Sequence, residues 1–183
     1  MITRLHEATH FHISWKMYYI IFMSQAETFY DDGLNFECNG CSYCCRFEGG
    51  VVLLSKEELF ALAEFTNLTA EQFIKVYCRF IQHENGTEYL ILKTLQNGDC
   101  IFWNSELFNG KGGCECYEAR PSQCSSYPFW EKILSSKISW EKEKSKCPGI
   151  NCGKKITSEE IKNQLEKYRN RIPLTKSDLT KTN

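Results

Sequence analysis

The sequence lacks the features that mark membrane-spanning and nucleic-acid-binding proteins. No stretch approaches the roughly 18 consecutive apolar residues of a membrane-spanning helix, so we expect no membrane partner. Basic and acidic side chains nearly cancel, with 22 Lys and Arg against 23 Asp and Glu, and this balance argues against a nucleic-acid partner. The chain also has no internal repeat and no low-complexity tract.

Cysteine is present, but in too small and too uneven a number for a disulfide scaffold. Eleven cysteines make up about 6% of the 183 residues, below the roughly 8–10% of such scaffolds. The number is odd, so the cysteines cannot all pair within one chain. A hydrophobic content of 42% supplies a core, and the length fits one domain with extensions. The sulfur atoms therefore need a role other than stapling the fold.

Residues 1–33 are expected to be an N-terminal extension without a secretion signal. The apolar run Met17–Met23 has seven residues, at the bottom of the range of roughly 7–15 for a signal peptide, and no small-x-small cleavage site follows it. Organised sequence begins just after Met23, which makes that residue a candidate alternative start. We expect a cytoplasmic location, where thiols stay reduced. Three histidines of the extension either join a metal site or, more simply, belong to a polar tail: His6, His10 and His12.

Three capping boxes predict three helices. In each box Ser or Thr precedes Glu or Gln by three residues, and the predicted helices cover 55–65, 69–81 and 157–171. Cys78 falls on the second helix, where we expect it to be a buried core residue. The apolar face of the first helix is expected to contain four residues: Leu59, Phe60, Leu62 and Ala63.

Short strands are predicted at 51–54, 89–95, 100–103 and 137–140. The turn signal Asn97-Gly98 pairs the second and third of these as a hairpin. Residues 174–183 are expected to be a disordered polar tail. The predicted fold class is α+β, a small antiparallel sheet with two to three helices and metal-centred cysteine-rich loops. A cysteine-cluster domain over 34–153 is followed by a C-terminal helix and tail over 154–183.

The first cysteine group is the strongest functional signal. Cys38, Cys41, Cys44 and Cys45 lie within eight residues. The C-x2-C spacing lets two thiolates converge on one zinc ion, and C-x2-C-x2-C also matches three ligands of a [4Fe–4S] cluster. Disulfides account poorly for these cysteines, because loops of two residues are strained. Adjacent side chains usually point apart, so Cys44 and Cys45 are expected to serve different metals, or one a metal and one the core.

Four remote cysteines complete a set of eight. Cys100, Cys114, Cys124 and Cys147 allow either two sites of four thiolates or one cluster with the remaining cysteines structural. Zinc held by four thiolates carries a formal charge of about −2, so cations are expected nearby. Two arginines are candidates by position: Arg46 and Arg120.

These residues resemble the YkgJ-type cysteine-cluster family, a group described as zinc- or iron-chelating. The resemblance covers about Phe36 to Gly149 and includes C-x2-C-x2-C-C, a Cys-hydrophobic-Phe segment, C-x2-Y-x2-R-P-x2-C-x2-Y-P and a late cysteine. The C-x2-Y spacing to Tyr117 makes Cys114 rather than Cys116 the family position. The resemblance implies metal ligation by eight cysteines: Cys38, Cys41, Cys44, Cys45, Cys100, Cys114, Cys124 and Cys147.

The chain departs from this family at a few positions. Ser42 and Ser125 stand where the family often has Gly and Arg, which affects hydrogen bonds around a metal rather than ligands. Cys78, Cys116 and Cys152 are extra, and the last two are alternative ligands. A related cysteine pattern occurs in flagellin lysine methylases, but this chain has no GxGxxG loop after a strand.

The sequence therefore predicts a metal-binding cysteine-cluster protein. Its cofactor is zinc or iron, the latter including a [4Fe–4S] cluster, and all-thiolate ligation suits both. The alternatives are a protein-modifying enzyme related to the lysine methylases, a redox Fe–S protein and an exported disulfide protein. No substrate or catalytic residue follows from the sequence, and both an unidentified protein partner and enzymatic activity stay open.

Overall fold

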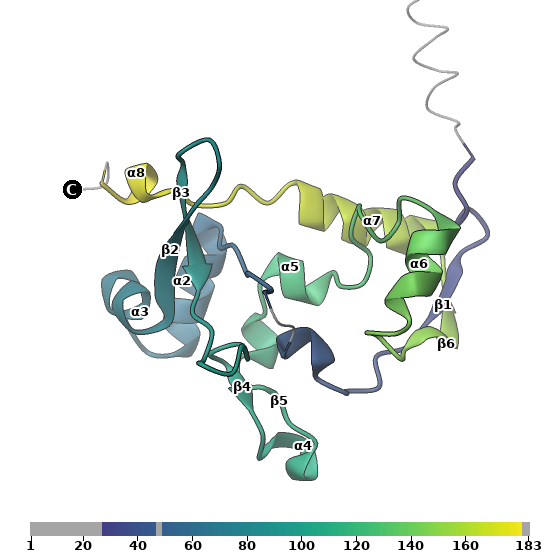
Figure 1. Ribbon diagram of the computed structural model, residues 1–183, viewed down its shortest axis with the longest axis horizontal. Coiled ribbons are helices and arrows are strands. Elements are labelled where there is room, and N and C mark those ends of the chain that lie inside the picture. The colour runs from purple at the N-terminus through teal and green to yellow at the C-terminus, as the bar shows by residue number, and fades with distance from the viewer. Residues whose placement is uncertain (1–26, 47–48, 181–183) are drawn as a thin grey trace, which may run out of the picture.

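The computed structural model describes residues 27–46 and 49–180. The interpretations of Met23 and of the N-terminal histidines therefore lie outside the described residues. Helices are combined with small antiparallel sheets of two strands, which confirms the α+β class. The main elements form two groups, with the short helix α5 (Ser122–Ser125) between them (Figure 1).

The first group packs α2 (Lys56–Phe65) and α3 (Ala70–Tyr77) beside a hairpin of β2 (Cys78–Gln82) and β3 (Glu88–Leu92). Both helices begin at their predicted capping boxes, where Ser and Thr side chains accept backbone hydrogen bonds. The C-terminal helix α8 (Lys176–Thr180) lies beside β3 (Figure 1). The apolar side chains between these elements form the first core, which consists of Leu54, Leu59, Leu62, Ala63, Phe73, Cys78, Leu90, Leu92, Phe102, Cys116 and Leu174.

The second group pairs β1 (Leu34–Phe36) with β6 (Ile150–Ile156) and adds α6 (Lys137–Glu143) and α7 (Ser158–Arg169). The predicted capping box at Thr157 begins α7. These elements enclose the second core, which consists of Tyr30, Phe129, Ile133, Leu134, Trp140, Cys147, Ile150, Ile161 and Leu165.

The segments at and beside the central cysteines are short. They are the 3-10 helices η1 (Tyr43–Cys45) and η2 (Tyr117–Ala119), the ribbon of β4 (Trp103–Asn104) with β5 (Gly113–Cys114), and α5. The one-turn α4 (Leu107–Gly110) connects the two strands of the ribbon.

The helix predicted over 69–81 is shorter in the structure. It ends at Tyr77, and Cys78 has extended backbone and begins β2. The strand turns back at Asn85-Gly86, where Gly86 has a positive φ of 81°. Pairing with β3 therefore overrides the helical spacing of the sequence. Cys78 is nevertheless buried in the first core, 5% exposed, as predicted.

The predicted hairpin of 89–95 with 100–103 has the wrong partner, because β3 pairs with β2. The turn at Asn97-Gly98 does form, but only Thr94 and Cys100 bridge across it. Of the predicted strand 51–54, Leu53 makes a single bridge to β3.

The predicted strand over 137–140 is also wrong, since these residues lie in α6. Ser136 caps the helix by accepting a hydrogen bond from the Ser139 N–H at 3.1 Å. Trp140 then reaches the second core, whereas Ile138 is 68% exposed. Only Trp140 of these two apolar side chains is buried, as expected for one face of a helix rather than for a strand.

Two further expectations are corrected. Phe60 is 53% exposed, because it lies about 100° around α2 from the buried Leu59. Leu174 is buried, and its backbone pairs with Leu54 and Leu90, so the start of the predicted disordered tail is ordered. In the part of the chain described here, no helix combines the length and the apolar character needed to span a membrane.

Candidate metal centre

The chain segment of the first cysteine group is held at both ends. Just before it, the Glu37 N–H donates to the Gly149 carbonyl at 3.2 Å, which joins it to the second group. Ser42 has a left-handed backbone (φ 53°) and accepts a hydrogen bond from the Cys45 N–H, closing the 3-10 turn η1. Because such a helix has about three residues per turn, the side chains of Cys44 and Cys45 leave it roughly 120° apart.

Trp103 and Arg46 fix this turn to the β4–β5 ribbon. The Trp103 indole N–H donates to the Ser42 hydroxyl at 3.1 Å. The Arg46 guanidinium lies 5.1 Å from the centroid of the Trp103 ring and donates to the Cys41 carbonyl at 3.4 Å. Arg46 thus contacts the backbone of the cysteine loop rather than a thiol.

Cysteines from distant parts of the chain lie near the turn η1. The Cys100 N–H donates to the Cys45 carbonyl at 2.7 Å. Interaction with the thiols of Cys114 first and then of Cys44 raises the pKa of Cys45. On the ribbon, the Cys114 and Cys116 sulfur atoms are 3.5 Å apart. The Cys116 side chain is 1% exposed and belongs to the first core.

These contacts divide the thiols into donors and acceptors of hydrogen bonds. Hydrogen bonds from Cys116 and then from Cys45 lower the pKa of Cys114 to about 3. A hydrogen bond from Cys45 lowers the pKa of Cys44 to about 7, and the charge of Arg120 adds to this effect. The pKa values of Cys45 and Cys116 are raised, because their thiol protons are shared with these neighbours. Two of the thiols therefore have thiolate character, the form that binds metal.

Two more cysteines join this group from the side of the β4–β5 ribbon and from α5. Burial raises the pKa of Cys100 to about 11 and also raises that of Cys124, and in both the charges of neighbouring cysteines add to the effect. We call the resulting set of six the inner cysteine cluster: Cys44, Cys45, Cys100, Cys114, Cys116 and Cys124.

The remaining members of the predicted ligand set lie on the side of the second group. The β1–β6 register pairs Phe36 with Ile150, so Cys38 follows one strand just where Cys147 precedes the other. Burial first, together with the charges of Cys41, Cys38 and Cys44, raises the pKa of Cys147 to about 11. Cys38, Cys41 and Cys147 therefore lie near one another, and we call them the outer cysteines.

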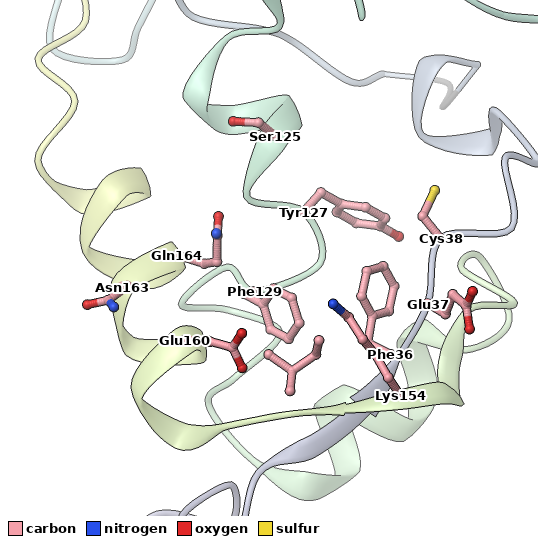
Figure 2. Close-up of a pocket in the computed structure, with 11 residues that line it drawn as sticks. Phe36, Glu37, Cys38, Ser125, Tyr127, Phe129, Lys154, Glu160, Asn163 and Gln164 are labelled. Carbon is pink, nitrogen blue, oxygen red and sulfur yellow. The ribbon is translucent and has the colours of Figure 1, made fainter. Parts of the chain in front are cut away.

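A cavity of about 670 Å³ borders Cys38, one of the outer cysteines. Figure 2 shows Cys38 at its edge beside Tyr127, with the rings of Phe36 and Phe129 on the apolar wall and Lys154 and Glu160 across from Tyr127. The Tyr127 hydroxyl donates to Glu143 at 2.9 Å. Burial first and then this carboxylate raise the pKa of Tyr127, so its phenol stays protonated.

Arg120, one of the two cations predicted near the thiols, packs against the ring of Tyr117. Its guanidinium carbon is 3.6 Å from the centroid of the Tyr117 ring, and its Nε–H donates to the Tyr117 carbonyl at 2.9 Å. From this position its charge lowers the pKa values of Cys44 and Cys114, in each case adding to larger hydrogen-bond effects.

The three extra cysteines have three different surroundings. Cys78 lies in the first core, and exposed Cys152 donates to the Pro148 carbonyl at 3.4 Å. Cys116, by contrast, lies within the inner cysteine cluster. Its C-x-C spacing from Cys114 and the ribbon turn are the sequence signals that place it there. The contribution of Trp103 and Ser42 to the site has no comparable local signal.

The inner cysteine cluster offers the right ligand atoms for a metal centre, but its side chains are not arranged in a complete coordination geometry. Within residues 27–46 and 49–180, no three or more His, Cys, Asp or Glu side chains are positioned to hold a metal ion. The donor set is nevertheless all sulfur, which suits zinc and iron. The 3.5 Å between Cys114 and Cys116 is close to the edge of about 3.8 Å expected for a tetrahedron with Zn–S bonds of about 2.3 Å.

Comparison with models of protein families gives a match. Residues 37–148, more than half of the chain, match the model of the CxxCxxCC family, whose description is "putative zinc- or iron-chelating domain". The matched region contains all eight cysteines of the predicted ligand set. No solved structure matches the chain.

Proposed function

The chain belongs to the CxxCxxCC family, and we propose that it binds zinc or iron through thiolates of the inner cysteine cluster. The ligands proposed for this centre are Cys45, Cys100, Cys114 and Cys124. Cys116 is a fifth thiol that hydrogen-bonds one ligand and can replace another. The proposal concerns binding and leaves the biological use of the metal to experiment.

One observation supports the proposal above the others. Cysteines from four separate segments lie near one another, at residues 44–45, 100, 114–116 and 124, while all eleven cysteines remain free thiols. Thiols that sit together without pairing are costly to keep as a mixture of charged and buried neutral groups. A bound cation would compensate this cost directly, because it stabilises every thiolate around it.

The close sulfur pair favours a single zinc ion over a cluster at this centre. In a [4Fe–4S] cluster each cysteine binds a different iron atom, so ligand sulfurs are held apart by the cluster itself. Cys114 and Cys116 are instead at the separation of neighbouring ligands on one ion, which is the arrangement that results where Cys116 replaces one of the other proposed ligands. Free thiols also suit a reducing compartment, and on this basis we propose a cytoplasmic location.

Metal analysis of the full chain, purified without oxygen, tests the proposal. We expect stoichiometric zinc and a colourless solution. Broad visible absorption with iron would keep the thiolate centre but replace zinc by an Fe–S cluster. A protein with neither metal, whose thiols all react with a thiol reagent, would overturn the proposal.

A pair of variants assigns the binding to the inner cysteine cluster. Cys124→Ser should remove metal from this centre, because serine replaces a soft thiolate by a hydroxyl. Cys152→Ser is the matched control, since Cys152 is exposed and bonds only a backbone carbonyl. Equal metal content in both variants would contradict the assignment.

A further inference from the structure

The cavity beside Cys38 is not explained by the proposed metal centre, because none of the described residues that line it belongs to the inner cysteine cluster. It lies between the β1–β6 pair, α7 and the segment of residues 125–129 (Figure 2). Its volume of about 670 Å³ is within the range of roughly 300–1,000 Å³ of small-molecule pockets. The cavity is therefore large enough for a ligand of its own.

One wall of the cavity is apolar and is fixed by the second core. The rings of Phe36 and Phe129 meet edge to face, with centroids 5.4 Å apart. Phe129 also stacks on Trp140 at 5.8 Å, and both of these side chains are buried. The wall is therefore in place before a ligand binds, and it favours an aromatic or branched apolar group.

An irregularity in β6 places a positive charge at this wall. Phe36 pairs with Ile150, whereas the residue before Phe36 on β1 pairs with Lys155. Residues 151–154 are therefore extra on β6 and form a bulge, and bulges commonly re-aim a side chain. Figure 2 shows the side chain of Lys154 extending into the cavity beside the Phe36 ring.

A negative charge lies at the side of the cavity formed by α7. The Oε2 atom of Glu160 accepts hydrogen bonds from the N–H and the hydroxyl of Thr157, at 2.8 and 3.0 Å, which leaves Oε1 for another donor. Among the residues that the structure describes, neither Lys154 nor Glu160 forms an ion pair. Both charges are therefore available to one bound molecule.

Gln164 adds an unsatisfied acceptor to the same cavity. Its Oε1 atom is buried and accepts no hydrogen bond from the described part of the chain. A buried acceptor without a donor is unfavourable. The terminal torsion of a glutamine amide is broad, so a rotation of this group can present Oε1 to a donor in the cavity.

The two charges decide which molecules fit. A ligand with one charge would cover the opposite protein charge without a partner, and a neutral apolar ligand would cover both protein charges in this way. A molecule that carries both an ammonium and a carboxylate group pairs with each of them. Its apolar part can then lie on the aromatic wall.

We propose that this cavity binds a small zwitterion with a large apolar side chain, which is the chemistry of a free amino acid or a dipeptide. Lys154 pairs with the carboxylate of the ligand, and Glu160 pairs with its ammonium group. The Gln164 amide accepts an N–H from the ligand, whose apolar side chain lies against Phe36 and Phe129. This inference goes beyond the proposed function and does not require a bound metal.

An NMR titration of the isotope-labelled full chain, as purified, tests the ligand class. The zwitterionic probes are phenylalanine and the dipeptide phenylalanylalanine, and we expect the better of them to bind with a Kd of about 1 mM or lower. Hydrocinnamate, which lacks the ammonium group, and phenethylamine, which lacks the carboxylate, should each bind about tenfold more weakly or worse. The tighter zwitterion identifies the source of the ligand, a free amino acid or a short peptide.

Two results of this titration would overturn the proposal. One is that neither zwitterion binds below about 10 mM. The other is that hydrocinnamate or phenethylamine binds as tightly as phenylalanine. The amide signals that shift should belong to residues 36–38, 125–129 and 154–164, and shifts confined to the first group of elements would also contradict the proposed location.

A pair of neighbouring variants tests the role of the ammonium group. Lys154→Gln should weaken binding of phenylalanine and of hydrocinnamate by about tenfold and leave that of phenethylamine unchanged, because only the first two probes carry a carboxylate. Lys155→Gln is the matched control, since Lys155 does not line the cavity. Equal affinities of the two variants for phenylalanine, with unchanged circular dichroism, would exclude Lys154 as the carboxylate partner.

Discussion

Individual residues set the ionisation of the inner cysteine cluster more than its overall burial does. Burial raises thiol pKa values, as at Cys100 and Cys124. Cys114 departs from this trend because two thiols donate hydrogen bonds to it and Arg120 adds a positive charge. Arg120 therefore favours the metal-binding form of the thiols without being a ligand.

Removing the Arg120 charge should weaken metal binding. Arg120→Gln is expected to lower zinc affinity at neutral pH by about tenfold, which corresponds to a shift of about one pKa unit or 1.4 kcal/mol spread over the thiols. Competition with a chromophoric chelator measures the affinity, and Arg120→Lys should retain most of it. Arg169→Gln is the matched control, since this arginine is exposed and pairs with Glu131. Identical affinities for Arg120→Gln and Arg169→Gln would exclude the electrostatic role.

At the scale of helices and strands, the capping boxes predict the starts of three helices correctly, whereas the pairing of distant strands is not predicted. The capping boxes at Ser55, Thr69 and Thr157 all begin helices, because their hydrogen bonds lie within four residues. The end of α3 depends instead on pairing between β2 and β3, which helical spacing cannot reveal. The turn Asn85-Gly86 was the available signal for this hairpin.

The candidate site divides in the same way. Cysteine spacing and the family resemblance predict the set of eight thiols, since ligand motifs are local in sequence, and their role as ligands stays a prediction. The inclusion of Cys116 depends on the β4–β5 ribbon, and the support of η1 by Trp103 depends on a hydrogen bond over 61 residues. Such contacts exist only after the chain has folded.

The capping box of α7 provides a test at this scale. Thr157→Ala should lower the free energy of unfolding by about 1 kcal/mol, because the Glu160 N–H loses its side-chain acceptor. Denaturant unfolding measures the effect. Glu166→Gln, on an exposed part of the same helix, is the control and should change little.

Glu160 adds a pH dependence to the same test. The N–H and then the hydroxyl of Thr157 lower the pKa of Glu160 in the folded protein. Its contribution to stability is therefore fully present above the ordinary Glu pKa of about 4.3 and is lost as the pH falls through the lower folded value. Glu160→Gln should destabilise the protein at pH 7, and the difference from the parent should shrink below about pH 4. A difference that grows on acidification would show the opposite sign of linkage.

On the scale of the whole molecule, polar groups rather than a shared core join the two element groups. Gln123 bonds the Val51 carbonyl and the Leu53 N–H on one side and Arg171 on the other. It is adjacent to Cys124, so the polar junction and the inner cysteine cluster are continuous. An ion bound by cysteines in the segments that connect the two element groups would make the two cores unfold more cooperatively.

Removal of metal should therefore uncouple the two cores. The metal-loaded chain is expected to unfold in one calorimetric transition, whereas the reduced, metal-free chain should show a lower midpoint and separate transitions for the first and second cores. Structural zinc contributes about 10–16 kcal/mol in small zinc-finger peptides, so a loss of several kcal/mol is expected here. Hydrogen exchange should rise most at residues 38–46 and 100–124, because these segments depend on the bound ion for their contacts. A zinc-saturated chelator is the control and should have no effect. An unchanged single transition, after metal analysis has confirmed complete removal, would mean that Gln123 and its hydrogen bonds couple the cores without metal.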